Sequence, residues 1–289
     1  NSMDIEAITG AAFVALASTL LFLVIAKSWS TLSRTVGSSP SFADSIMHEA
    51  AQRFRDELDR LSSSQSIYLS GTLVFLVLFV AAYVLQARVL FAGYPAWQLW
   101  LQIGFLAIAA GLAAWRLGRT ILAYRQVSFV RDANVAVGHQ LQRISTGANR
   151  VFHDVKTSAG VVDHVLVGQT GIYAVNVVAK RGGQKGSAVL KDSFLSFSNR
   201  DDAIPVVDIA ASTARLEKEI RRLLGHKIRV RSVIAVPGWD VGEQASEKHL
   251  LVNERTIAML RGWRDQSDYL MNEDVDALQR ELPVRCSRR

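Results

Sequence analysis

The chain has 289 residues, of which 49% are hydrophobic, and it carries a formal net charge of +7. This length allows about two domains at roughly 100–200 residues each. The single cysteine, Cys286, excludes an internal disulfide and any zinc site built from cysteines. The basic balance suits an anionic lipid surface or nucleic acid as a partner, and the high hydrophobic fraction indicates membrane segments.

Three uncharged apolar runs, at residues 8–26, 67–85 and 97–115, predict transmembrane helices. Each is long enough for a hydrocarbon core of ~30 Å, which takes about 20 residues. Acidic residues precede the first run, where a cleaved signal peptide would carry basic ones, so an uncleaved anchor is favoured. The short connection at residues 86–96 makes the second and third runs a helical hairpin.

The polar segment between the first two runs predicts an amphipathic helix, which Ser41 caps and the serines at positions 62–64 end. Two interpretations are open for this helix. It packs on the main domain or a partner subunit, or it lies in the membrane interface.

Lys and Arg are concentrated after the first and third runs. The positive-inside rule therefore places the N-terminus outside and the C-terminal domain in the cytoplasm, at a bacterial inner membrane. The expected fold class is a membrane protein with three transmembrane α-helices and a cytoplasmic α/β domain. The expected parts are an anchor (1–26), an amphipathic segment (27–66), the transmembrane hairpin (67–125), the α/β domain (126–264), and a C-terminal helix with a basic tail (265–289).

Beyond residue 125 the pattern changes to short β-branched runs and amphipathic helices, which predict a mixed α/β sandwich. The expected helices span residues 130–147, 205–224, 254–263 and 273–282, and the expected strands span residues 151–155, 161–167, 172–178, 189–197, 228–236 and 249–252.

The most informative stretch is VVDHVLVGQTGIYAVNVVAKRGG, at residues 161–183. Two β-branched runs on either side of the glycine-containing turn at residues 168–171 predict a β-hairpin. Asp163 lies inside the first run. Burying a carboxylate among valines is unfavourable unless a cation, hydrogen bonds or an open face compensates, so Asp163 is the residue to explain.

This stretch resembles the nuclease-related domain, NERD, of the PD-(D/E)xK nuclease group, over roughly residues 132–263. The resemblance implies a nuclease fold with an acid on the first strand, then an acid, a spacer and a lysine on the second, and often a glutamate on the preceding helix. Asp163 fills the first position. Asn176 and Val178 stand at the second acid and the lysine, and His139 stands where the glutamate is expected.

The reaction that the resemblance implies is Mg²⁺-dependent phosphodiester cleavage, in which carboxylates hold the metal and a lysine orients the attacking water. A neutral amide and an aliphatic side chain do neither, so we expect a degraded active site and no cofactor. If cleavage remains, the candidate catalytic residues are Asp163 and Lys180, the latter two residues past the lysine position. Asp163 and Asp154 would then hold Mg²⁺.

Further candidates come from basic and imidazole side chains. The basic loop that follows the hairpin suits a phosphate backbone, or equally a solvated loop facing acidic lipid. The basic stripe on the helix at residues 205–224 is interrupted by glutamates and indicates a solvated face. Histidines near Asp163 would extend a metal site, although structural histidines are commoner. The candidate nucleic-acid-binding residues are Lys180, Arg181, Lys185 and Lys191; the stripe is Arg215, Lys218 and Arg222; the histidines are His139, His153 and His164.

Three functions follow as hypotheses. The first is a membrane-anchored nuclease-like domain that no longer cuts and serves as a nucleic-acid-binding or assembly module. The second is an active Mg²⁺-dependent nuclease with a migrated lysine. The third is a structural subunit of a membrane complex without nucleic-acid contact. The expected partners are accordingly the lipid bilayer, DNA or RNA, and other membrane-complex subunits or a second copy of the chain.

Overall fold

The computed structural model describes most of the chain beyond residue 50. The described residues are 51–87, 96–145, 147, 149–182, 186–191, 193–198, 200–245, 248–261 and 269–286, and for some of these, including 72–87 and 96–111, only the backbone is described. The chain divides into two compact units. One comprises Asn1–Pro40 and Glu57–Gln126, and the other comprises Ser41–Asp56 and Val127–Arg289.

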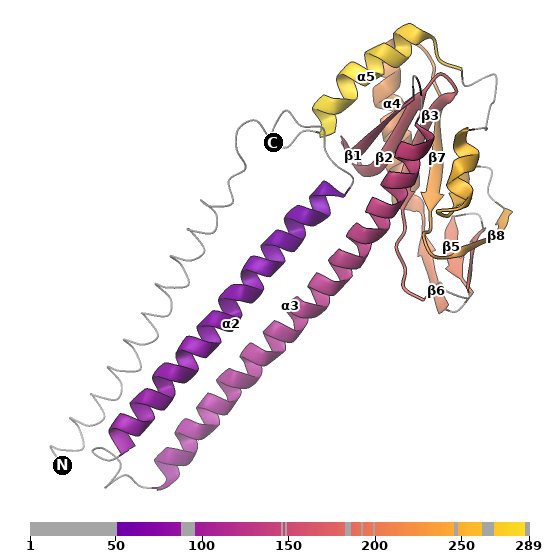
Figure 1. Ribbon diagram of the computed structural model, residues 1–289. Coiled ribbons are helices and arrows are strands. Elements are labelled where there is room, and N and C mark those ends of the chain that lie inside the picture. Colours follow the sequence, from indigo (N-terminus) through magenta and orange to yellow (C-terminus); the bar gives the residue numbers. More distant parts are fainter. Residues whose placement is uncertain are drawn as a thin grey trace. The chain divides into compact units, whose positions relative to one another are not determined.

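Two long helices, α2 (Gln52–Ala87) and α3 (Ala96–Ile144), contain the apolar runs at residues 67–85 and 97–115 (Figure 1). Within the part of the chain that the structure describes, no helix combines the length and apolar content needed to cross a bilayer. This corrects the expected fold class of a membrane protein with three transmembrane helices. Both runs belong to longer helices that also carry charged residues, and the first predicted span, at residues 8–26, lies outside the described residues.

The sequence predicts that the helix ends at the serines of positions 62–64, but α2 continues through them. The Ser63 hydroxyl donates to the Asp59 carbonyl at 2.8 Å, and the Ser64 hydroxyl donates to the Arg60 carbonyl at 3.0 Å. These bonds back to the preceding turn satisfy the hydroxyls inside a helix, so the serines do not compete with its backbone. The helix therefore runs through the expected break.

The second unit is an α/β fold built on a five-stranded mixed sheet with strand order β1-β2-β3-β7-β9 (Figure 1). β1, β2 and β3 pair antiparallel, and β3, β7 and β9 pair parallel. The predicted hairpin is β2 and β3, and its turn closes on Gly171, whose φ of 130° suits a residue without Cβ. The strands are β1 (Arg150–Thr157), β2 (Gly160–Gly168), β3 (Gly171–Val177), β7 (Val230–Ala235) and β9 (His249–Val252).

Helices cover both faces of this sheet. On one face, the last turns of α3 and the 3-10 helix η4 (Thr256–Arg261) pack on the strands through residues such as Leu141 and Ile257. On the other face, α4 (Val207–Leu224) and α5 (Asn272–Cys286) pack through Leu216 and Leu278. β2 is therefore buried along most of its length, which explains its near-continuous apolar sequence.

A second sheet of four strands has the order β6-β5-β4-β8. Its buried residues share a core with Ile234 of β7, Leu251 of β9 and Trp239. The sequence predicted one strand at residues 189–197, but two antiparallel strands form there. The outer strands β6 and β8 were not predicted, because their polar sequences lack the apolar alternation of a buried strand. The strands are β4 (Ser187–Lys191), β5 (Phe194–Phe197), β6 (Arg200–Pro205) and β8 (Asp240–Ala245).

Helix α4 ends where the sequence predicts. Gly225 adopts the left-handed conformation with a φ of 78°, and its N–H donates to the Arg221 carbonyl at 3.0 Å. Helix α5 ends with Cys286, which is buried in the core shared with β1. Burial raises the pKa of this thiol to about 12, and the neighbouring Asp154 acts in the same direction.

Candidate functional site

The candidate site lies where β2 and β3 stop pairing. The last registered pair at this end is His164 with Val175, and Asp163 is the next residue of β2 beyond that pair. Beyond this point the Asp163 carboxylate takes the place of a backbone partner, because the N–H of Val177 donates to its Oδ2 at 2.7 Å. The carboxylate is 7% exposed, so this hydrogen bond offsets part of the cost of burying it.

Asp154 on β1 lies directly opposite Asp163. The pairs His153–His164 and Val155–Val162 flank the two aspartates, which do not themselves form a registered pair. Asp154 has a φ of 52°, a left-handed conformation that is uncommon for a residue with a Cβ. Two carboxylates opposite each other on adjacent strands repel, so this arrangement requires a cation.

The cation is Arg53, from the first turn of α2. Its Nη2 donates to Oδ1 of Asp163 at 2.5 Å, and its Nε lies 3.8 Å from Oδ1 of Asp154. The backbone N–H of Arg53 also donates to Oδ2 of Asp154, at 3.3 Å. Because this N–H has no partner inside the helix, Asp154 acts as an acceptor at the positive end of α2. The guanidinium lies over the Phe54 ring, 4.4 Å from its centroid.

Burial is the largest influence on Asp163 and raises the pKa of its carboxyl group above the usual 3.8. The positive charge of Arg53 and the hydrogen bond from Val177 oppose this shift, and the charge of Asp154 adds to it. In chemical terms, the two acids and one guanidinium form a cluster with a net charge of −1 when both acids are ionised.

His153 and His164 lie beside the acids but form a pair of their own. Their Nδ1 atoms are 2.8 Å apart, and Nε2 of Gln142 lies 3.3 Å from Nε2 of His153. If the Gln142 amide donates, His153 carries its proton on Nδ1 and donates it to Nδ1 of His164. Burial holds the pKa of His164 well below 6.5, with the charge of His153 acting in the same direction and the Asn134 backbone opposing it.

The pairing of these Nδ1 atoms with each other indicates a structural role for the two histidines. His139 is exposed on α3 and is not part of this pair. Among the described residues, no group of three or more His, Cys, Asp or Glu side chains is placed to hold a metal ion. The prediction of a histidine-containing metal site therefore gains no support.

The two positions at which the resemblance expects an acid and a lysine, Asn176 on β3 and Val178 directly after it, have different surroundings. Continuing the β2–β3 register places Asn176 opposite Asp163, and Asn176 is 6% exposed. Its side-chain Nδ2 is buried without a hydrogen-bond partner. Val178 packs against the core of the second sheet. The row Asp154, Asp163 and Asn176 thus crosses three strands, while the position of the expected lysine belongs to the apolar core.

The residues of the predicted basic loop follow β3 in the chain. Lys180 is held through its backbone, whose carbonyl accepts a hydrogen bond from Nε1 of Trp239 at 2.8 Å. The Arg181 guanidinium lies over the Phe129 ring of α3 at 5.0 Å. Lys191 is exposed at the end of β4, and Lys185 lies outside the described residues.

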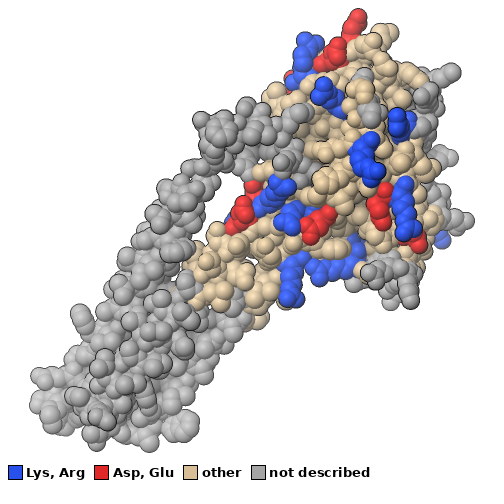
Figure 2. Space-filling view, viewed as in Figure 1, with Lys and Arg blue, Asp and Glu red and all other residues tan. Residues whose placement is uncertain are grey.

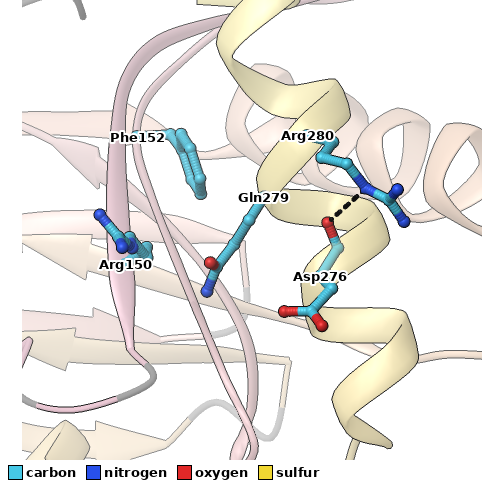
Figure 3. Close-up of a pocket in the computed structure, with 5 residues that line it drawn as sticks. All are labelled: Arg150, Phe152, Asp276, Gln279 and Arg280. Carbon is cyan, nitrogen blue, oxygen red and sulfur yellow. Dashed lines mark hydrogen bonds between the residues drawn. The ribbon is translucent and has the colours of Figure 1, made fainter.

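A separate cavity of about 500 Å³ lies between β1 and α5. Its lining mixes opposite charges with one aromatic residue: Arg150, Phe152, Asp276, Gln279 and Arg280. In Figure 3, Gln279 points toward β1, whereas Arg280 turns toward its own helix, where Nε donates to the Asp276 carbonyl at 3.3 Å. The two guanidinium groups do not converge, so the cavity does not form an anion site.

Sequence reasoning identified both acids of the site but missed Arg53. It placed this arginine on the charged surface of an amphipathic helix. Arg53 and Asp163 are 110 residues apart in the chain, and a lone arginine in a charged run carries no signal of such a contact.

Comparison with known proteins supports the resemblance over part of the chain. No curated protein and no solved structure matches this chain. Residues 131–237 match the family model NERD, the nuclease-related domain. Asp154, Asp163 and Asn176 lie inside the matched segment, and Arg53 lies outside it. Residues 131–237 are therefore similar to a nuclease-related domain, with an acid pair on the adjacent strands β1 and β2.

Proposed function

We propose that this chain carries a nuclease-like domain that binds nucleic acid without cutting it. The observation that supports this proposal is the Arg53 guanidinium at the acid pair. Nuclease-like domains of this family are typically metal-dependent, and the metal is held by carboxylate oxygens. Here a side chain of the protein itself provides the positive charge.

The replaced positions support the same proposal. Asn176 offers a neutral oxygen and carries a buried amide, so it cannot add the negative charge that a second acid would supply. Val178 is partly buried against an apolar core and, as an aliphatic side chain, cannot orient a water molecule. Lys180 follows two residues later, and its backbone carbonyl is anchored to Trp239.

The loop after β3 is the part of the surface that we propose contacts the phosphate backbone. Trp239 fixes the Lys180 carbonyl and Phe129 supports the Arg181 guanidinium, so the loop is held in place at two consecutive residues. Figure 2 shows Lys and Arg side chains scattered over one face with Asp and Glu among them. The proposal therefore depends on this loop and not on a continuous basic face.

The first test is binding and cleavage by the full chain. We expect fluorescently labelled DNA or RNA to bind at low salt, with affinity falling steeply as salt rises. We expect the labelled strand to stay intact with Mg²⁺ or Mn²⁺. The double variant Lys180→Gln/Arg181→Gln should reduce the slope of log affinity against log salt by about 1–2, because each lost phosphate contact contributes roughly 0.9.

The matched control is Lys218→Gln/Arg222→Gln, which removes the same charge from the exposed surface of α4. Equal weakening by both double variants would show that net charge, not the loop, drives binding. Cleavage that disappears in Asp163→Asn would replace the proposal with an active nuclease. An absence of binding at low salt would leave an assembly role as the remaining hypothesis.

A further inference from the structure

Arg53 is fixed at the acid pair by two independent parts of the residue. Its guanidinium bonds Asp163, and its backbone N–H bonds Asp154. Two residues before Arg53, Ala51 is 1% exposed and has a φ of 65°, and its carbonyl accepts the N–H groups of Phe54 and Arg55. The start of α2 is therefore shaped so that its first turn points at the two carboxylates.

A divalent cation does not fit this arrangement while Arg53 is present. Oδ1 of Asp163 accepts from Arg53, and Oδ2 accepts from Val177. Mg²⁺ and Mn²⁺ need several oxygen ligands with free lone pairs, preferably from carboxylates. Asp154 also faces both the backbone and the side chain of Arg53. A metal ion would have to displace the guanidinium to reach either acid.

We infer that Arg53 is the built-in counter-cation of the Asp154–Asp163 pair and that it excludes a divalent metal ion from this pair. Removing the guanidinium leaves two buried carboxylates opposite each other beside the Asn176 amide, which is the donor set of a weak divalent-cation site. The inference rests on the proposed function for the location of the site, but it does not depend on nucleic-acid binding.

The test is thermal unfolding of the full chain with EDTA or with MnCl₂, in the absence of nucleic acid. The wild-type protein should melt at the same temperature in both. Arg53→Gln should melt roughly 5 °C lower in EDTA, because the guanidinium that contacts both acids is lost and their repulsion grows. MnCl₂ should recover most of this loss in Arg53→Gln.

Two variants make the result specific. Arg53→Gln/Asp163→Asn removes the repulsion together with the site, so it should melt above Arg53→Gln in EDTA and should not respond to Mn²⁺. Arg60→Gln, on the same helix, removes an arginine whose side chain is 80% exposed and whose pair with Glu57 spans 4.0 Å. It should match the wild-type protein in both conditions.

The inference would be overturned if Mn²⁺ raised the melting temperature of Arg53→Gln no more than that of Arg60→Gln. A wild-type response to Mn²⁺ that Asp163→Asn abolishes would also overturn it, because the metal would then reach the acids past Arg53. Both results are independent of the binding assay, so failure of this inference and failure of the proposed function are distinguishable.

Discussion

At the scale of single residues, Asp163 combines a high burial cost with two specific partners. Its carboxylate accepts from Arg53 and from the Val177 backbone, yet burial still raises its pKa. A raised carboxyl pKa means that the folded state favours the protonated form. The stability linked to this proton is fully present below pH 3.8 and is lost as the pH rises through the folded-state pKa.

Asp163→Asn should therefore change the free energy of unfolding at pH 7 by less than about 1 kcal/mol, because the amide oxygen can still accept from Val177 and Arg53 still contacts the buried Asp154. Asp163→Ala should cost about 2–3 kcal/mol, because it leaves the Val177 N–H unpaired. Denaturant unfolding at pH 7 and near pH 4 measures the free energy of unfolding of both variants and of the wild-type protein. At the lower pH the stability of the wild-type protein should rise relative to that of Asp163→Asn. A larger loss in Asp163→Asn than in Asp163→Ala would contradict this account.

At the scale of elements, the turn between β9 and η4 shows how one side chain fixes a junction. The Asn253 carbonyl oxygen Oδ1 accepts from the N–H groups of Arg255 and Thr256 at 3.0 and 2.9 Å. Its Nδ2 donates to the Trp239 carbonyl at 3.0 Å. The sequence predicted a helix at residues 254–263, and the helix that Asn253 caps there is the 3-10 helix η4.

Asn253→Ala should lower the free energy of unfolding by about 1–2 kcal/mol, because it removes the cap and the bond to Trp239 together. Asn253→Asp keeps the acceptors of the cap but loses the Nδ2 donor, so it should fall between the wild-type protein and Asn253→Ala. Urea unfolding followed by tryptophan fluorescence measures all three. An Asn253→Ala variant as stable as the wild-type protein would show that the junction does not need this cap.

The same scale shows which elements sequence patterns can predict. The β2–β3 hairpin was predicted because two β-branched runs flank a glycine-containing turn. Helix α4 was predicted because its apolar residues follow the helix period and a glycine comes directly after them. β6 and β8 lie at the outer edges of the second sheet and carry polar sequences, so they offer no such period. The end expected at residues 62–64 was wrong, because serine hydroxyls bonded back to Asp59 and Arg60 inside α2.

At the scale of the whole second unit, Glu219 ties three elements together. From α4 it accepts from the backbone and hydroxyl of Ser158, in the β1–β2 turn, and from Arg285 of α5 at 2.5 Å. Arg215 lies 3.3 Å away on the same helix. Burial acts to raise the pKa of Glu219, but the Ser158 and Arg285 contacts outweigh it, and the pKa lies below 4.5.

Glu219→Gln should lower the free energy of unfolding by about 1 kcal/mol at pH 7, a modest value because solvent screens these pairs. The stability that the ionised group adds is present above pH 4.5 and is lost as the pH falls through its lowered pKa, so the effect of the substitution should shrink in acid. Glu281→Gln removes an exposed partner 3.8 Å from Arg285 and should change little. Unfolding measured from pH 7 to pH 3 separates the two variants.

The candidate site was predicted in part. Asp163 was identified because a charge inside a valine-rich strand demands a partner, and Asp154 was named with it. Arg53 was not predicted. Its contact with Asp163 joins residues 110 positions apart and depends on how the start of α2 meets the sheet, which no local pattern encodes. The expectation of transmembrane helices was wrong for the described helices, because apolar runs alone do not show where a helix begins and ends.

The core of the second unit extends past the segment that matches the nuclease-related domain. That match stops at residue 237, but β9, η4 and α5 follow it and bury Leu251, Leu260 and Leu278. Similarity boundaries and folding boundaries therefore differ in this protein. A fragment cut at residues 131 and 237 would expose apolar surface on both sides of its sheet, so it would precipitate. It would also lose the guanidinium that contacts both acids, and it would misreport the chemistry of the intact chain.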